Sequence, residues 1–254
     1  MKPKTESEII AIRKSGQMLA EVLRKIEDML APGVTGLEID AMAQATLKKM
    51  GSKPAFLGVQ AGPGVPDFPA AVCISVNDAV VHGIPTDVPF KEGDIVGFDF
   101  GVLYGGMITD AARTFIVGGK ARSTREADMV KATLRSLDEG INVIKNGART
   151  GDIGAAVQKV LDDNNLGIVR ELVGHGVGHE LHEAPEIPNY GFKGMGDLLK
   201  TGMTIAVEPM STLGDWKVVI DPDGWTIRTR DGSLSAHFED TLLVTEDGVE
   251  ILTR

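Results

Sequence analysis

Residues 99–110 have the sequence DFGVLYGGMITD, in which a Gly-Gly pair separates two β-like runs. Such a pair is typical of the two-residue turn of a β-hairpin. A turn at this place pairs Gly101 with Asp110 and Asp99 with Ala112, and side-chain alternation then puts both aspartates on one face. The sequence therefore predicts a hairpin that brings two carboxylates to about 7–8 Å from each other.

These two aspartates are unusual, because aspartate is depleted in strands. Two carboxylates that converge over small residues repel each other unless one of them keeps its proton. A divalent cation removes the repulsion, since hard cations prefer oxygen ligands. An exposed strand with two ordinary surface aspartates fits the hairpin equally well, so this segment alone leaves both interpretations open.

Composition narrows the class of protein. The 254 residues carry a formal net charge of −10, which disfavours a broad nucleic-acid-binding face. The single cysteine, Cys73, excludes an internal disulfide and favours a reducing compartment. The N-terminus lacks the apolar core of a secretory signal, and no apolar run is long enough to cross a bilayer. We therefore expect a cytoplasmic globular protein without a membrane span.

Helices precede the hairpin. Apolar residues at helical spacing predict a helix over about residues 6–30, which ends before Pro32-Gly33. Thr35 followed by Glu38 is a capping-box pattern and predicts a second helix that extends to about Met50. Short β-like runs then follow, and the hairpin is one of them.

The same order returns later in the chain. An amphipathic run over about residues 123–144 is followed by a second Thr-Gly helix start, which aligns Thr150 with Thr35, and β-like runs extend from about 169 to 252. This repetition indicates an internal duplication. Strands joined by tight turns favour antiparallel pairing, and helices on one face of such a sheet predict an α+β layered fold.

Two glutamates are as anomalous as the two aspartates. Glu208 follows TIAV and Glu239 precedes DTLLV, so we expect both inside strands, where an edge position is the ordinary explanation. Histidines are concentrated in the segment 174–185, GHGVGHELHEAP. That segment does not fit the zinc-protease helix His-Glu-x-x-His, because its second histidine comes one residue too early.

Taken together, five segments resemble the type I methionine aminopeptidases of the M24 peptidases, in their short bacterial-like form. The segments are VCISVNDAVVHGIP (72–85), DFGVLYGGMITDAA (99–112), GHGVGHELHEAP (174–185), TIAVEPM (204–210) and LSAHFEDTLLVT (234–245). The resemblance implies the pita-bread α+β (α/β) fold, with two pseudo-symmetric halves and a curved antiparallel β-sheet covered by helices. It implies a single catalytic domain over residues 1–254, with halves of about 1–120 and 121–254.

The resemblance also implies a dinuclear metal site for two divalent ions (Co, Mn, Fe or Zn). The implied metal ligands are Asp99, Asp110, His175, Glu208 and Glu239. In this family Asp110 and Glu239 would bridge the ions, His82 and His182 would contact the substrate and the tetrahedral intermediate, and Glu208 would also move protons. The implied reaction is hydrolytic removal of the initiator methionine by a metal-activated water.

The implied substrate-binding residues, besides His82 and His182, form a methionine pocket. They are Cys73, Phe68, Leu181 and Trp225, while Phe56 and Val59 fit simple core packing equally well. Residues 62–67 look like an insertion beside this pocket. His179 and His237 do not match family ligands, although His237 shares a strand face with Glu239 and a supporting role stays open.

The implied partner is a nascent polypeptide or peptide N-terminus with methionine first and a small residue second. A transient contact with the ribosome and a monomeric state follow from the family only. Two alternatives stay open: a proline-directed peptidase such as aminopeptidase P or prolidase, and a non-catalytic relative that has lost its metals. The first is expected to carry a further N-terminal domain, and the second to have lost ligands that this sequence keeps.

Overall fold

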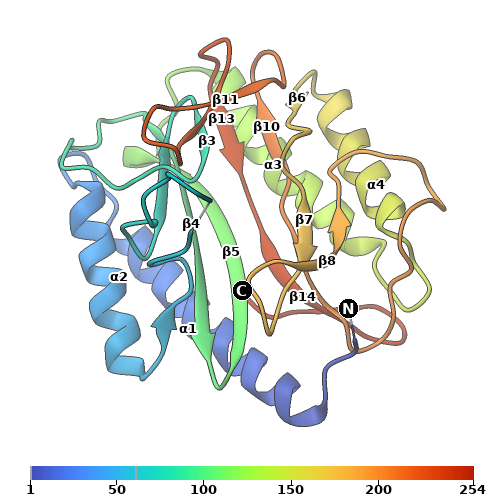
Figure 1. Cartoon of the computed structure of the whole chain (residues 1–254). Helices are drawn as coiled ribbons and strands as arrows, with labels where there is room; N and C mark the ends of the chain where they lie inside the picture. The colour runs from blue at the N-terminus through green and yellow to red at the C-terminus, as the bar shows by residue number, and fades with distance from the viewer. Residues whose placement is uncertain (1, 61) are drawn as a thin grey trace.

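The computed structural model describes residues 2–60 and 62–254, and within them it contains four α-helices and short to long β-strands (Figure 1). The helices are α1 (Glu6–Met29), α2 (Gly36–Met50), α3 (Thr124–Asn142) and α4 (Thr150–Asp163). The strands of the first half are β1 (Lys53–Pro54), β2 (Cys73–Val76), β3 (Ala79–Val81), β4 (Ile95–Tyr104) and β5 (Met107–Ile116). The later strands are β6 (Gly167–Ile168), β7 (Gly174–Gly176), β8 (Glu183–Ile187), β9 (Thr204–Val207), β10 (Met210–Thr212), β11 (Val218–Ile220), β12 (Ile227–Thr229), β13 (Ser235–His237), β14 (Asp240–Val244) and β15 (Val249–Ile251).

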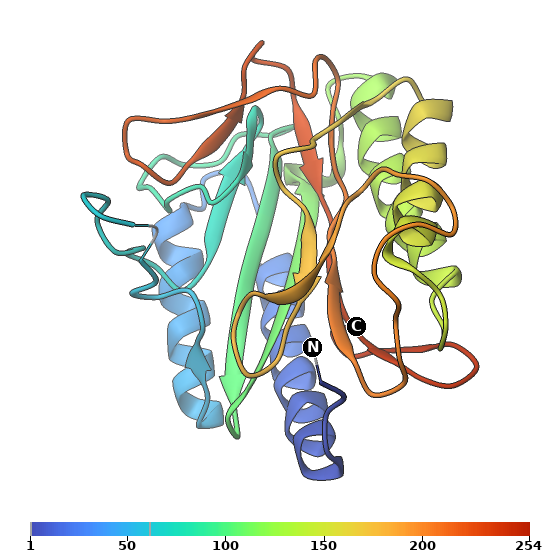
Figure 2. The ribbon, with the colours of Figure 1, turned by 45° about the vertical axis from the view of Figure 1, so that its right-hand side comes forward.

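The predicted hairpin is confirmed in its register. Strands β4 and β5 pair antiparallel over their full lengths, with Asp99 opposite Ala112 and Gly101 opposite Asp110. The long hairpin lies at the centre of the molecule, as Figure 2 shows. Its outer neighbours in the sheet are β1 and β2, which pair with β4 and put Cys73 opposite Asp99.

The hairpin meets the second half of the chain at Ala112 and Glu239. The Ala112 and Glu239 backbones exchange N–H to carbonyl hydrogen bonds at 3.0 and 3.3 Å, which joins β5 to the β13–β14 segment. That segment pairs in turn with β9 and β10. The two halves therefore share one curved surface of strands.

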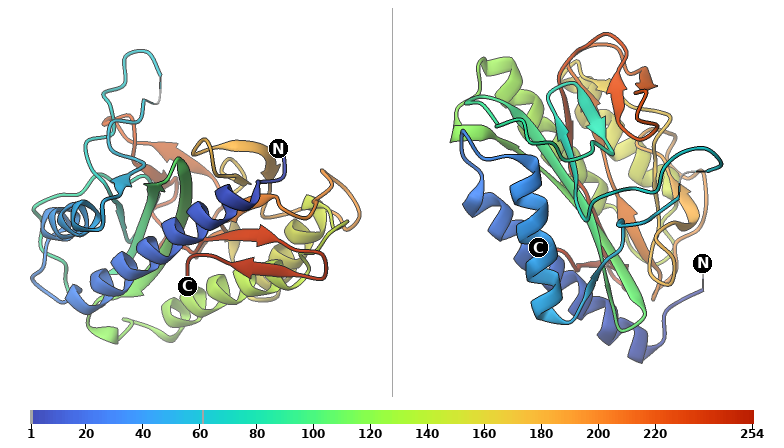
Figure 3. Two further views of the ribbon diagram at one scale, coloured as in Figure 1. Left: turned by 90° about the horizontal axis from the view of Figure 1, so that it is seen from below. Right: turned by 60° about the vertical axis from the view of Figure 1, so that its left-hand side comes forward.

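Helices cover one side of these strands. Helix α1 packs against β4 and β5, and α3 packs against β10 and β13. Figure 3 shows the helices along one face of the sheet, with loops of both halves on the opposite face. The interior includes Phe98 and Phe100 at 0% exposure, and each fully buried side chain of this size contributes roughly 1.5–3 kcal/mol. Among the residues that the structure covers, no helix combines the length and apolar character needed to span a membrane.

A backbone pattern repeats around α2 and α4. Gly33 and Val34 exchange hydrogen bonds with Phe90, and Gly147 and Ala148 exchange them with Leu199 in the same way. The residue after each pair is the N-cap of the following helix, Thr35 for α2 and Arg149 for α4. Each cap also forms an isolated antiparallel β-bridge, Thr35 with Pro89 and Arg149 with Leu198.

This pattern corrects one detail of the sequence alignment. Thr35 corresponds to Arg149, not to Thr150, which is already the first residue of α4. The carboxylate of Asp152 accepts the Arg149 N–H at 2.8 Å, as that of Glu38 accepts the Thr35 N–H at 2.8 Å. The acidic residue, not the threonine, is therefore the feature that the two helix starts share.

Candidate active site

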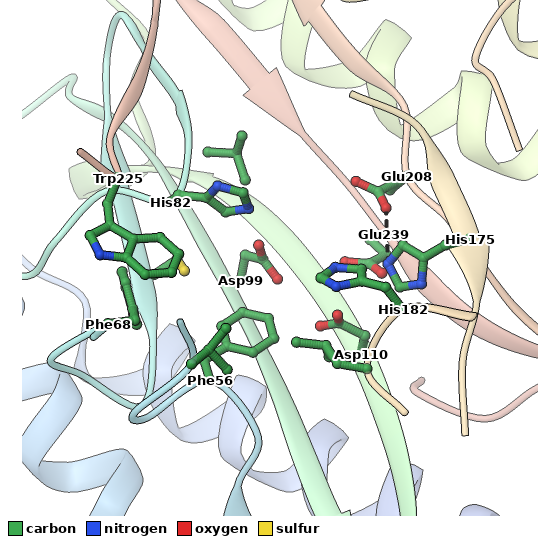
Figure 4. A pocket seen from close by; sticks show the side chains of 14 residues that line it. Phe56, Phe68, His82, Asp99, Asp110, His175, His182, Glu208, Trp225 and Glu239 are labelled. Carbon is green, nitrogen blue, oxygen red and sulfur yellow. Dashed lines mark ion pairs between the residues drawn. The ribbon is translucent and has the colours of Figure 1, made fainter. Parts of the chain in front are cut away.

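One cavity gathers every side chain that the sequence singled out for metal binding, catalysis or the methionine pocket (Figure 4). Its lining residues are Phe56, Val59, Phe68, Cys73, Val81, His82, Asp99, Asp110, His175, Leu181, His182, Glu208, Trp225 and Glu239. Figure 4 shows the carboxylates between an aromatic side, with Trp225 and Phe68, and a histidine side, with His175 and His182. The cavity thus has an acidic centre and an apolar end.

The hairpin supplies two of the acids. Asp99 on β4 and Asp110 on β5 lie diagonally across the ladder and are 7% and 3% exposed. Gly101, opposite Asp110, is required by packing, because a Cβ there would lie 2.9 Å from Ala55 Cβ and 3.2 Å from Phe56 Cε1. The small residue lets the Phe56 ring approach the hairpin as a cavity wall.

Glu208 and Glu239 come from the other strand pair. We expected both inside strands, but each lies in a two-residue break, between β9 and β10 and between β13 and β14. Val207 is opposite Asp240 on one side of the break, and Met210 is opposite His237 on the other. Glu208 therefore faces Glu239, an arrangement that is destabilising for two like charges. The regular ladder is interrupted at the point where the carboxylates converge.

Protein contacts satisfy the buried acids only in part. Within the described part of the chain, Oδ1 of Asp99, Oδ1 of Asp110 and Oε1 of Glu239 have no hydrogen-bond partner. Burial and neighbouring carboxylates raise the pKa of Asp99, Glu208 and Glu239 well above the ordinary range, and burial raises the pKa of Asp110 to about 7. Ionised oxygens in this setting require a cation, because buried charges are otherwise paired or neutralised.

His175 strengthens this requirement. Its Nδ1 lies 3.0 Å from the Gly176 carbonyl, which can only accept, so Nδ1 carries the proton. Nε2 then presents a lone pair, and it lies 3.3 Å from Oε1 of Glu208, a second acceptor. A proton or a metal ion must stand between them, and an imidazole fixed through its other nitrogen is the usual form of a histidine metal ligand.

A cation fits this donor set. Atoms of Asp110, His175 and Glu239 lie within 4.8 Å of one another, close enough to ligate one ion, and all three residues are buried. Asp99 and Glu208 line the same cavity and would extend the set. Carboxylate and imidazole donors suit Mn, Fe, Co and Zn.

Two further histidines frame the acids. The His182 ring lies edge-on to the His175 ring, with centroids 4.4 Å apart. His82 follows β3 with a φ of 58°, a left-handed conformation that is uncommon for a side-chain-bearing residue. Burial lowers the pKa of His82 to about 4, so its ring is neutral at physiological pH.

The apolar end is formed by aromatic contacts. The rings of Phe68 and Trp225 meet edge-to-face with centroids 5.1 Å apart. The Trp225 Nε1–H donates to the carbonyl of Pro66 at 2.7 Å, which ties the pocket wall to the segment 62–67. That segment contains no helix or strand, in agreement with the expected loop. Cys73 and Leu181 complete this wall.

Comparison with known proteins identifies the family. The family model described as "Metallopeptidase family M24" matches residues 10–246. The Methionine aminopeptidase of Clostridium perfringens is 41% identical over 250 residues, which cover 98% of this chain and 97% of that protein. This chain belongs to the methionine aminopeptidases of family M24.

Further comparisons agree with this membership. Methionine aminopeptidase B of Synechocystis is 42% identical over 97% of this chain and 89% of its own length. The crystal structure of methionine aminopeptidase from Thermotoga maritima superposes with a TM-score of 0.94 and 45% identity, and the match covers 100% of this chain and 99% of that one. The predicted pita-bread fold is therefore confirmed.

Two histidines outside the implied ligand set lie in different surroundings. His179 is 53% exposed at its side chain and bonds Glu8 at 2.7 Å, outside the cavity. His237 is buried and is not among the residues that line the cavity, and its Nε2 lies 3.7 Å from Oε2 of Glu208. This position fits a supporting contact to Glu208.

Some residues of the site escaped the sequence analysis. Val81 lines the cavity next to His82, although alternation would put neighbours on opposite faces, because the positive φ of His82 interrupts the strand. Asn189 donates its Nδ2–H to the Glu208 carbonyl at 3.0 Å, and Thr241 bonds the backbone of Asp110. The local sequence around Asn189 and Thr241 does not predict these contacts, because the partner residues lie elsewhere in the chain.

Proposed function

We propose that this chain acts as a methionine aminopeptidase that hydrolyses the first peptide bond of nascent proteins and peptides beginning with methionine. The observation that carries the proposal is the cavity itself, in which an apolar pocket adjoins a histidine lone pair and buried carboxylates whose oxygens are not all paired within the described residues. Family membership and identity near 40% over almost the whole chain support the same activity.

Two divalent ions would be held by five ligands: Asp99, Asp110, His175, Glu208 and Glu239. The family resemblance implies that Asp110 and Glu239 would contribute to both ions, and each has a buried oxygen without a hydrogen-bond partner among the described residues. When bound, the ions supply Lewis-acid chemistry that activates water and polarises the scissile carbonyl. The ions would be Co, Mn, Fe or Zn.

The chain's own residues would bind the peptide and manage protons. The neutral ring of His82 and the ring of His182 flank the acidic centre from opposite sides and would donate hydrogen bonds to the substrate and to its developing negative charge (Figure 4). Glu208 lines the cavity beside His175 and would take a proton from the nucleophilic water and pass it to the leaving amine.

The apolar end would hold the methionine side chain. Phe68, Cys73, Leu181 and Trp225 form its wall, and Phe56 and Val59 lie in the same lining. An unbranched thioether adapts well to an irregular aromatic pocket and gains from contact with ring edges. The free α-amine of the substrate would be attracted to the acidic centre near Asp99.

Residues 1–254 would form a single catalytic domain with pseudo-repeat halves of about 1–120 and 121–254, supported by the repeated backbone bonds before α2 and α4. The protein would act as a monomer in the cytoplasm, on N-termini with a small second residue, with transient contact to the ribosome. The buried free thiol of Cys73 agrees with a reducing compartment.

The direct test is release of methionine from a Met-Ala-Ser peptide before and after chelation, with an X-Pro peptide as the control substrate. We expect methionine release that chelation abolishes and that Mn²⁺ or Co²⁺ restores. Activity that survives thorough chelation, or that occurs only on the X-Pro peptide, would refute the proposal.

A further inference from the structure

Residues 177–182, here called the His182 loop, bring Leu181 and His182 into the cavity without any helix or strand to hold them. The side chain that supports this loop comes from the N-terminal segment of the sequence, from Lys4. Nζ of Lys4 lies 3.2 and 3.4 Å from the two carboxylate oxygens of Glu183 and 3.4 Å from Nδ1 of His179. The Lys4 side chain is only 1% exposed, so its ammonium is buried beneath the loop.

Glu183 transmits this contact to the loop backbone. Its Oε1 accepts the N–H groups of His179 at 2.7 Å and of Glu180 at 3.1 Å, on the N-terminal side of Leu181 and His182. The pKa of Glu183 is lowered below its ordinary value by these N–H groups and by Lys4, against the effect of burial. The carboxylate thus fixes the turn of the loop, and Lys4 fixes the carboxylate.

The loop also approaches Lys4 directly. A Cβ at Gly178 would lie 2.5 Å from Cε and 2.7 Å from Nζ of Lys4, so only glycine permits this contact. On the other side, the Gly178 carbonyl accepts the Ile108 N–H at 2.6 Å, from the strand that carries Asp110. The His182 loop is therefore clamped between Lys4 and β5.

Lys4 is itself anchored. Its backbone N–H donates to the Gly202 carbonyl at 2.8 Å, and the next residue, Thr5, caps helix α1. A buried ion pair is by itself a weak source of stability, because desolvation offsets the attraction. Precise placement of the loop accounts better for a lysine that is held at both its backbone and its ammonium.

We propose that Lys4 is a positioning residue for the reaction, which acts through Glu183 to hold His182 and Leu181 in their productive places. The inference rests on the proposed function, because it assigns His182 a contact with the reacting peptide. It predicts that the loss of Lys4 lowers kcat mainly while His182 is present.

A double-mutant cycle tests this dependence. The kcat and KM of wild type, K4M, H182A and K4M/H182A are measured on Met-Ala-Ser with Mn²⁺, and K2M, at the exposed lysine two residues earlier, is the matched control. We expect K4M to lower kcat by about 10–100-fold when His182 is present and by less than about threefold when it is absent. The kcat and KM of K2M should stay at the wild-type level. The Mn²⁺ affinity of K4M should also equal that of wild type.

A second measurement does not depend on activity. In NMR spectra of protein isotopically labelled at histidine, the ring resonance of His182 is assigned by its absence in H182A. This resonance should shift or broaden in K4M, while the ring resonance of His82 stays in place. If K4M does not fold, E183Q, which keeps an acceptor for the loop N–H groups, takes its place in both measurements.

Equal fold-losses of kcat in the two backgrounds, a wild-type kcat in the Lys4 variant, or an unmoved His182 resonance would each overturn the role of Lys4 alone. A wild-type protein that releases no methionine would overturn the proposed function, and this inference with it.

Discussion

The side-chain hydroxyl of Thr241 forms hydrogen bonds with both backbone groups of Asp110, the N–H and the carbonyl. Its Oγ1 accepts the Asp110 N–H at 2.8 Å and donates to the Asp110 carbonyl at 2.7 Å. Both residues are buried, and Thr241 lies on β14, in a different half of the chain from β5. A single hydroxyl therefore fixes one of the proposed metal ligands across the junction of the two halves.

Replacement of this hydroxyl should loosen the site. Thr241→Val leaves a buried N–H and a buried carbonyl of Asp110 unpaired, which should lower the free energy of unfolding by about 1–3 kcal/mol. Mn²⁺ affinity should fall by about 10–100-fold, as expected when a contact that orients a metal ligand is removed. Urea unfolding of the metal-free protein and titration calorimetry with Mn²⁺ measure the two effects.

Thr241→Ser is the matched control, because it keeps the hydroxyl and loses only a methyl group. It should keep Mn²⁺ affinity close to that of wild type. Equal losses of Mn²⁺ affinity in the valine and serine variants would show that the hydroxyl does not support Asp110.

The metal-free protein should become less stable as the pH rises from 6.5 to 8. Folding raises the carboxyl pKa, to about 7 for Asp110 and well above the ordinary range for Asp99, Glu208 and Glu239, so the folded state binds protons that the unfolded state has released. Stability falls with pH wherever the unfolded state binds fewer protons, by up to about 1.4 kcal/mol per pH unit for each such group.

The histidines whose pKa is lowered by burial have the opposite effect on stability: they make the folded state less stable as the pH falls. Burial lowers the pKa to about 4 for His82 and His175 and to about 3 for His237, so their contribution is complete only above the unfolded value, near 6.5. Between pH 6.5 and 8 the histidines titrate only in part, so thermal unfolding in chelator should show a net decline that comes from the carboxylates. With Mn²⁺ the decline should disappear, whereas a metal-free Tm that increases over this range would contradict raised carboxyl pKa values.

Asp110→Asn should separate folding from function. The variant keeps the shape of the side chain but removes a charge from the acidic centre, so we expect loss of Mn²⁺ binding and of methionine release with an unchanged circular dichroism spectrum. At pH 8 its metal-free form should be at least as stable as metal-free wild type, because one carboxylate no longer has to ionise in a buried place.

Asp87→Asn, at an exposed aspartate, is the control and should change the free energy of unfolding by less than about 0.5 kcal/mol. Full activity of Asp110→Asn would rule out Asp110 as a ligand.

Local chemistry accounts for the parts of the fold that the sequence predicted. The hairpin register follows from the Gly-Gly turn and from period-two alternation, and the start of α2 follows from the capping box of Thr35 and Glu38. The sequence alignment paired Thr35 with Thr150, one residue after the true cap of α4, because the Arg149 side chain makes no cap hydrogen bond. Only the bond from the Arg149 N–H to Asp152, the counterpart of that from the Thr35 N–H to Glu38, marks this cap. A pattern that depends on a polar cap fails when the cap residue is replaced.

Contacts between residues that are far apart in the chain could not be predicted from a local sequence pattern. The placement of Glu208 opposite Glu239 depends on a break in two paired strands, and alternation alone predicts continuous strands there. The contact of Lys4 with Glu183 joins residues that are 179 positions apart in the chain. The composition of the candidate site was therefore predictable from motifs, whereas the side chains that orient it were found only in the folded structure.

The methionine pocket can be tested through its tryptophan. Trp225→Phe keeps an aromatic ring against Phe68 but loses the indole N–H bond to Pro66, so the pocket wall should loosen. Because this wall would contact the substrate side chain and not the reacting bond, KM for Met-Ala-Ser should rise by about tenfold, equivalent to about 1.4 kcal/mol, with a smaller change in kcat.

The other tryptophan of the chain provides the control. Trp216 packs against Arg170, with 5.1 Å between the guanidinium and the ring, and it does not line the cavity. Trp216→Phe should leave KM unchanged, and it makes Trp225 the sole tryptophan, whose fluorescence should respond to added methionine. A ligand that packs against an indole ring alters the polarity around it, so bound methionine should change the fluorescence of Trp225. If KM is unchanged in Trp225→Phe, or if methionine does not change the fluorescence of Trp216→Phe, the side-chain pocket lies elsewhere.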